Sequence, residues 1–154
     1  MEKQKLVIVA MAIAAIFSSC SKDDDTSSSS PTATKLQLLT AHGWRLTTFL
    51  ENGVDMTNAY FSACELDDIY TYYTDSSYSI DEGPTKCDPN SPQIIETGTW
   101  AFGNNQNMVI LDPGPNEADL DILQLDANNF KYQESYFDSS AMVNVTYRAY
   151  FVKI

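Results

Sequence analysis

Basic side chains are scarce in this sequence: nine Lys and Arg stand against 21 Asp and Glu, a formal charge of −12. Nucleic-acid binding requires Lys and Arg to replace the counterions of phosphates, so a nucleic-acid partner is not expected. Removing residues 1–19 would delete Lys3, Lys5 and Glu2, leaving seven basic and twenty acidic side chains, about −13. Such acidity is typical of a soluble surface outside the cytoplasm, with a cation site as the alternative.

Catalytic motifs are also missing. The sequence has one histidine, His42, and contains no Gly-x-Ser-x-Gly, no Gly-rich phosphate loop and no zinc-ligand spacing. We therefore expect a protein that is not an enzyme and has no cofactor. The acidic pairs 67/68 and 119/121 leave glycan hydrolysis as an alternative, because two carboxylates can supply acid–base chemistry. The oxygen-rich segment 112–121 lacks calcium-loop spacing, so a solvated loop is the simpler interpretation.

The apolar run near the N-terminus is too short to cross a membrane. Residues 6–17 form twelve consecutive apolar positions after a basic start, and Ser18-Ser19-Cys20 follow. This arrangement predicts a secretory signal peptide over residues 1–19. The end of the run resembles the lipobox of bacterial lipoproteins, which implies that Cys20 receives the lipid, including palmitate, and becomes the mature N-terminus. Several acyl chains would anchor the protein stably to a membrane.

An acidic, polar segment follows Cys20. Ser21-Lys22-Asp23-Asp24-Asp25 resembles the tag that directs some outer-membrane lipoproteins to the cell surface. The resemblance implies surface exposure, and the periplasmic face is the alternative. Residues 26–34 hold no large apolar side chain and are expected to form a flexible tether. One domain should then span residues 35–154.

The domain is predicted to be all-β after one short helical turn over residues 35–42. The final segment, 143–151, shows the clearest two-residue alternation, and short segments between turn residues precede it. A bulge is expected after Ile122, where the alternation slips. The eight expected strands cover residues 44–49, 68–74, 78–81, 96–102, 108–111, 120–125, 130–136 and 143–151. Their sequential turns favour an antiparallel up-and-down barrel, with an open sandwich as the alternative.

Cys64 and Cys87 remain once Cys20 carries lipid. A pair of cysteines in an exported domain predicts a disulfide, whereas a metal site would need more soft ligands. About 22 residues lie between them, and closing such a loop is worth about 3.5 kcal/mol in the chain-entropy picture. The bond would clamp the hairpin between the two cysteines.

Three stretches of the middle third resemble the lipocalin-like domain of small bacterial lipoproteins: Cys64 to Tyr72, Asp81 to Pro89, and Glu96 to Trp100. The resemblance implies an eight-stranded up-and-down β-barrel over about residues 36–154. In true lipocalins, a first-strand Trp is covered by an Arg of the last strand, which here implies a Trp44–Arg148 pair. Gly43 adjoins Trp44 directly, a departure from the Gly-x-Trp pattern.

Aromatic side chains that share strand faces are the candidate ligand site. If these faces point inward, they form a cup for a small hydrophobic ligand, with residues 54–63 as its lid. The candidates are Tyr70, Tyr72, Trp100, Tyr147 and Phe151. The leading hypothesis is a lipid-anchored, non-enzymatic binding module. The same rings could instead fill a solid core, which would suit a structural or interaction accessory of a surface complex.

Overall fold

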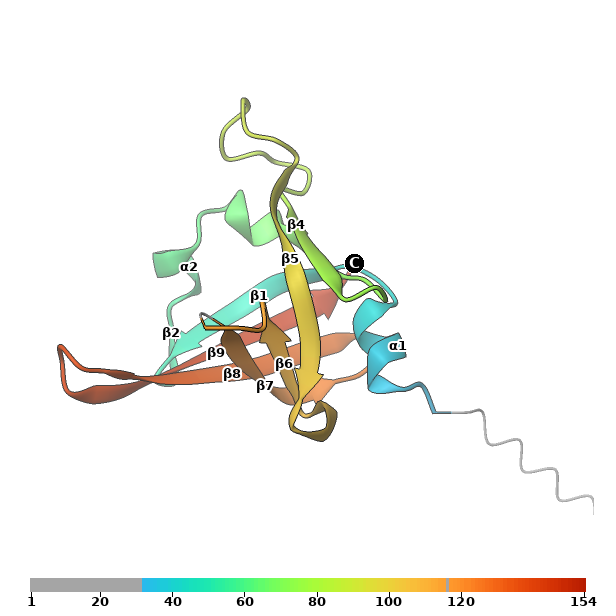
Figure 1. Cartoon of the computed structure of the whole chain (residues 1–154). Coiled ribbons are helices and arrows are strands. Elements are labelled where there is room, and N and C mark those ends of the chain that lie inside the picture. The colour runs from blue at the N-terminus through green and yellow to red at the C-terminus, as the bar shows by residue number, and fades with distance from the viewer. Residues whose placement is uncertain (1–31, 116) are drawn as a thin grey trace, which may run out of the picture. The chain divides into compact units, whose positions relative to one another are not determined.

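The computed structural model describes residues 32–154 except Asn116 (Figure 1). The expected signal peptide, Cys20 and most of the expected tether lie outside the described residues. Three short helical elements precede or interrupt the strands: α1 (Lys35–Thr40), α2 (Thr57–Tyr60) and the 3-10 helix η1 (Glu65–Asp67). A second 3-10 helix, η2 (Asn104–Gln106), follows later in the chain. Within residues 32–115 and 117–154, no helix has the length and apolar character needed to cross a membrane.

The strands form one antiparallel sheet that closes on itself. They are β1 (Trp44–Glu51), β2 (Val54–Asp55), β3 (Ile69–Tyr72), β4 (Ser77–Asp81), β5 (Ile94–Gly103), β6 (Met108–Leu111), β7 (Ala118–Leu125), β8 (Asn129–Asp138) and β9 (Val143–Lys153). Consecutive strands from β3 to β9 are neighbours, and β1 pairs with both β9 and β3. This closure confirms the predicted eight-stranded up-and-down barrel. The two-residue strand β2 is an addition that pairs only with the end of β1.

Local sequence explains most of the strand boundaries. The turn after β1 uses Asn52 and Gly53 with positive φ, as a tight hairpin requires. Asp75 accepts a hydrogen bond from the backbone N–H of Ser77 in the β3–β4 turn (3.0 Å). The register of β7 and β8 shifts between Ile122 and Gln124, so the expected bulge is confirmed.

Helix α1 lies at one end of the barrel beside Trp44. Thr34 caps the helix in a capping box with Gln37. Leu39 of α1 is fully buried, and its carbonyl oxygen accepts a hydrogen bond from Trp44 Nε1 (2.9 Å). The helix therefore anchors the beginning of β1 and covers this part of the core.

Candidate functional site

A small cavity inside the barrel is the candidate ligand site. Its volume is about 50 Å³. Aromatic side chains from β3, β4, β8 and β9 line it together with aliphatic and polar neighbours: Tyr70, Thr71, Tyr72, Tyr78, Ser79, Ile80, Glu96, Leu111, Leu120, Tyr132 and Phe151. Five of these eleven residues are aromatic, and the wall also carries several oxygen atoms.

For three tyrosines of this wall, Tyr70, Tyr72 and Tyr132, no hydrogen bond contributes to the pKa of the hydroxyl group. Burial raises the pKa of Tyr70 to about 12 and raises the pKa of Tyr72 and Tyr132 well above the ordinary value. The three rings also influence one another electrostatically, since the charge of one would raise the pKa of the next. The cavity therefore holds a group of protonated hydroxyls that can donate and accept hydrogen bonds.

The hydroxyl group of Tyr78 forms hydrogen bonds with two carboxylates, those of Glu96 on β5 and Asp112 after β6. This hydroxyl donates to Glu96 Oε1 (2.6 Å) and also lies 3.1 Å from Asp112 Oδ2. Asp112 also accepts a hydrogen bond from the backbone N–H of Thr99 (2.8 Å), which lowers the pKa of this carboxyl. Glu96 therefore reaches the cavity wall as a fixed acceptor.

Three of the five predicted ligand residues line the cavity, namely Tyr70, Tyr72 and Phe151. Trp100 does not; it packs edge-on behind Tyr72, with ring centroids 5.8 Å apart. Tyr147 lies in a separate cluster with Phe49, 5.2 Å between centroids. Tyr132, which alternation places on the same strand face as Phe130, also lines the cavity but is not among the five candidates.

The predicted lid, residues 54–63, folds into β2 and α2 and covers that separate cluster. The rings of Tyr60 and Phe61 contact Phe49 at centroid distances of 5.5 and 5.3 Å. Tyr60 also donates a hydrogen bond to Glu51 Oε2 (2.6 Å). None of the residues that line the cavity comes from this segment.

The expected Trp44–Arg148 pair is wrong. Trp44 lies opposite Lys153 in the β1–β9 ladder, whereas Arg148 lies opposite Leu50, about 16 Å further along the strand. Ala149 and Phe151 point inward, so the alternation of β9 places Arg148 on the outer face. There its Nε donates to Gln133 Oε1 (2.9 Å).

Trp44 is covered by other groups. The His42 ring meets it edge-on at a centroid distance of 4.4 Å, and Phe130 lies 5.7 Å away on the inner side. Together with α1, these rings do the packing that an arginine does in true lipocalins. His42 is therefore a structural neighbour of Trp44.

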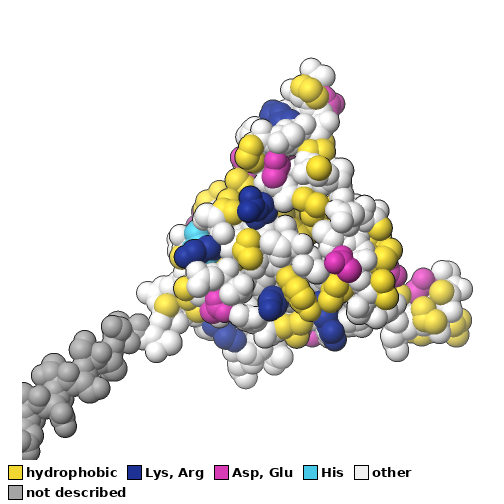
Figure 2. Space-filling model, turned by 180° about the vertical axis from the view of Figure 1, so that it is seen from behind, with side chains coloured by type: hydrophobic (Ala, Val, Ile, Leu, Met, Phe, Trp, Pro, Cys, Tyr) yellow, Lys and Arg dark blue, Asp and Glu magenta, His cyan; other side chains and the backbone are white. Residues whose placement is uncertain are grey.

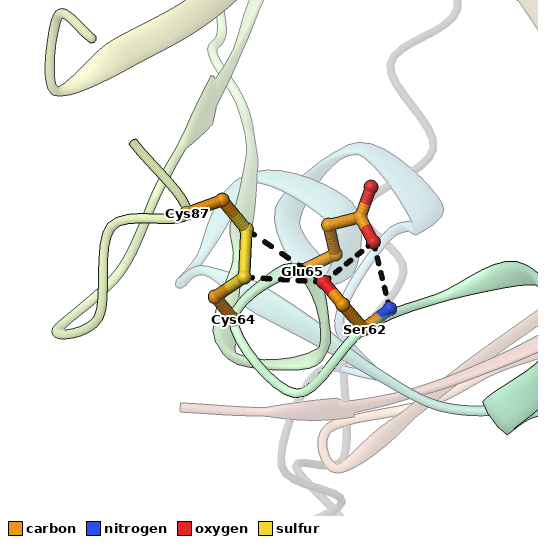
Figure 3. The surroundings of a disulfide bond; sticks show 4 residues. All are labelled: Ser62, Cys64, Glu65 and Cys87. Atoms are coloured by element: carbon orange, nitrogen blue, oxygen red, sulfur yellow. Dashed lines mark hydrogen bonds between the residues drawn. A yellow bond between two sulfur atoms is a disulfide. The ribbon is translucent and has the colours of Figure 1, made fainter. Parts of the chain in front are cut away.

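The disulfide between Cys64 and Cys87 is confirmed, with a Cα–Cα distance of 5.3 Å (Figure 3). It joins the segment before β3 to the loop after β4, as predicted. Ser62 lies beside both sulfur atoms, and its hydroxyl and backbone N–H donate to Glu65 Oε2 (2.7 Å each). The disulfide and these hydrogen bonds fix the end of the β3–β4 hairpin. Both cysteines are used in the disulfide bond.

Two acidic side chains are buried directly before β3 and directly after β4. Asp68 is 6% and Glu82 is 5% exposed, and each has one carboxylate oxygen without a hydrogen-bond partner. Even so, no group of three or more His, Cys, Asp or Glu side chains in the described part of the chain is placed to hold a metal ion. The same finding covers the described residues of the acidic segment 112–121.

Comparison with known protein families gives a match. Residues 41–132 match the model of a family described as a lipocalin-like domain. The match covers more than half of the 154 residues and includes β1 to β7. No curated protein is similar enough to the chain to count as a match.

Proposed function

Since the chain belongs to the lipocalin-like domain family, we propose that it is a non-enzymatic binding module for one small ligand inside the barrel. The carrying observation is the group of three tyrosines, Tyr70, Tyr72 and Tyr132, that line one cavity and whose hydroxyl pKa values are raised by burial with no contribution from a hydrogen bond. Buried polar groups usually have hydrogen-bond partners, so such a group favours a ligand that supplies them. The surrounding rings favour a ligand with an apolar body.

The volume limits the ligand. A water molecule needs roughly 10–15 Å³ of such space, and an engineered cavity of about 150 Å³ holds benzene. At about 50 Å³, the cavity matches only a few non-hydrogen atoms in this conformation. A phenol-sized ligand is larger than this volume and requires side chains of the wall to move, and fatty acids, sterols or haem require far more space. We therefore propose a small, hydroxyl-bearing or amphipathic compound.

Phenol and benzene are matched probes for this proposal. Both have the same ring, but only phenol can exchange hydrogen bonds with the tyrosines. We expect phenol to bind more tightly, and the variant Tyr132→Phe to weaken phenol binding about five- to tenfold, since one hydrogen bond is worth about 1 kcal/mol. Benzene binding should be unchanged in this variant. Ligand-observed NMR titrations measure both affinities.

The control variant is Tyr147→Phe, which removes a hydroxyl outside the cavity. Its partner there is the Tyr136 hydroxyl, 3.3 Å away. This change should leave both affinities as they are. If neither probe binds the full chain at millimolar concentration, the binding proposal fails and the accessory role below takes its place.

We further propose that the domain is anchored outside the cytoplasm by lipid on Cys20, on the outer membrane and facing the cell surface. The support is the basic start, the apolar run of residues 6–17 and Ser18-Ser19-Cys20. The variant Cys20→Ala should release the protein from membranes or block its processing. Protease treatment of intact cells should remove the domain, and protection that ends on lysis would indicate the periplasmic face.

A structural or interaction accessory with a solid core is the second candidate. The observation in its favour is the dense packing of the interior. Tyr72, Trp100, Phe130 and Phe151 are all buried and contact one another or further rings. Such a core stabilises a scaffold whether or not the small cavity takes a ligand.

A further inference from the structure

The β8–β9 hairpin continues past the barrel wall (Figure 1). The last pair between β7 and β8 is Asp121 with Gln133, and the last pair between β1 and β9 is Glu51 with Tyr147. Beyond these points β8 and β9 pair with each other as far as Asp138 and Val143. The outer part of the hairpin is therefore a two-stranded ribbon with two lateral edges.

The two edges differ. On the β9 side, Asn52 of the β1–β2 turn donates its backbone N–H to the Thr146 carbonyl (2.8 Å) and accepts from the Thr146 N–H at its side-chain oxygen (3.0 Å). This contact occupies Thr146, the residue of the β9 edge that lies next to the barrel. On the β8 side, residues 134–138 pair with no strand other than β9 within the described part of the chain. Residues 134–138 are named the β8 edge below.

Large apolar side chains are exposed on this ribbon. Phe137 is 55% and Met142 is 72% exposed, and Tyr136 and Val143 are also well exposed. Hydrophobic atoms cover much of the projecting hairpin at the right of Figure 2. An unpaired strand edge with exposed apolar side chains is the arrangement to which a further strand adds, because backbone hydrogen bonds and side-chain burial then act together.

We propose that the β8 edge binds an extended segment of a partner protein that carries cationic side chains. Glu134, Tyr136 and Asp138 share one face of the strand, with the two acids flanking the ring. In a pairing of two copies of this edge, the antiparallel register that matches all five residues would place Glu134 against Asp138 twice. Like charges directly opposite each other destabilise a ladder, which disfavours a second copy.

The same geometry defines the partner's pattern. Opposite the β8 edge, a strand needs Lys or Arg at two positions four residues apart, with an apolar residue midway to cover Tyr136. The residues between these positions face the side of Phe137 and should be apolar too. The site does not depend on the cavity, so it can function with or without a small ligand.

A synthetic peptide tests this proposal, with Lys-Val-Leu-Val-Lys at its centre and uncharged, capped ends. A second peptide with Glu in place of both Lys is its control. We expect the lysine peptide to bind the full chain at least tenfold more tightly than the glutamate peptide. Its binding should also slow hydrogen exchange at the backbone amides of residues 134–138, as measured by mass spectrometry.

Two variants locate the site. Glu134→Lys leaves one base and one acid, Asp138, at the two positions and should therefore remove the preference between the two peptides, and Phe137→Ser should weaken the lysine peptide several-fold. Val54→Ser removes a comparably exposed apolar side chain from β2 and should have no effect. Equal binding of the two peptides, or protection that falls elsewhere, would overturn the proposal. So would a dimer of the free chain in which residues 134–138 are already protected.

Discussion

The carboxyl groups of Asp68 and Glu82 lie next to each other in the interior, and each leaves one oxygen atom without a hydrogen-bond partner. The two residues follow directly on the last pair of the β3–β4 ladder, Ile69 with Asp81. Burial is the main cause that raises the pKa of Asp68 to about 6, and Glu82 is the next. The other contributing charges, Asp67, Glu65 and Asp81, are also acids. A proton on Asp68 would remove one of these buried negative charges.

This relationship predicts that Asp68 destabilises the domain at neutral pH. The pKa of Asp68 rises from 3.8 to about 6 on folding, so the folded state binds its proton more tightly than the unfolded state does. Its destabilising effect is absent below pH 3.8, grows as the pH rises, and is complete above pH 6. Asp68→Asn should therefore raise the free energy of unfolding at pH 7 by up to about 3 kcal/mol, with little gain at pH 4.

Urea unfolding at the two pH values measures the effect. Asp126 is a control of opposite sign, because hydrogen bonds, first from the Asn128 N–H and then from Gln124, lower its pKa to about 2. Asp126→Asn should lose stability at pH 7 rather than gain it. A gain for Asp68→Asn that is equal at both pH values would contradict the proton-linked explanation.

Removing the disulfide should lower the stability by about 3.5 kcal/mol, because the loop between Cys64 and Cys87 then regains its freedom in the unfolded chain. The double variant Cys64→Ser/Cys87→Ser tests this in thermal or urea unfolding. A reducing agent should produce a similar loss in the original chain and none in the variant. Non-reducing peptide mapping should find the two cysteine peptides linked; free thiols in native protein would refute the bond.

Trp44 and Arg148 should contribute very unequally to stability. Trp44 is completely buried and donates a hydrogen bond to the Leu39 carbonyl, so Trp44→Phe leaves a cavity and an unpaired acceptor. We expect a loss of about 2–4 kcal/mol. Arg148→Ala removes a side chain on the outer face and should cost less than about 1 kcal/mol. Comparable losses for the two variants would contradict this expectation and support the Trp44–Arg148 pair.

The barrel itself was predictable from local pattern. Val145, Ala149 and Phe151 alternate with polar residues along β9 and are all buried, as the two-residue period requires. The same alternation already separated Arg148 from the inward face, but the family resemblance suggested a pair that register and face exclude. Alternation identifies the inward side chains of a strand; register with the next strand decides which of them meet.

The site was less predictable for two physical reasons. Alternation placed Tyr72 and Trp100 inside, but cannot tell whether neighbouring rings fill the space between them; here they reduce the cavity to about 50 Å³. The burial of Asp68 beside Glu82 depends on how the β3–β4 ladder is paired, which no local sequence signal fixes. Acidic side chains were expected at the surface, and within residues 32–115 and 117–154 these two are buried instead.

Gly98, in the Gly-Thr-Trp part of the family resemblance, should tolerate no side chain. A Cβ atom there would lie 2.5 Å from both the Tyr78 ring and Asp112 Oδ1. Because Tyr78 and Asp112 bond each other beside the cavity, neither can move without losing that contact. Gly98→Ala should therefore destabilise the domain by about 1–3 kcal/mol, the usual effect of overpacking.

A double-mutant cycle identifies the cause. If the clash is responsible, Asp112→Ala should relieve part of it, so the loss caused by Gly98→Ala should be at least 0.5 kcal/mol smaller in that background, on the order of couplings between contacting residues. Gly53→Ala is the comparison, because a Cβ at Gly53 meets nothing within 4 Å and only its φ of +84° is unfavourable. Additive losses from Gly98→Ala and Asp112→Ala would show that the clash of the new Cβ atom with Asp112 is not the cause. The loss at Gly98 would then come from the backbone conformation.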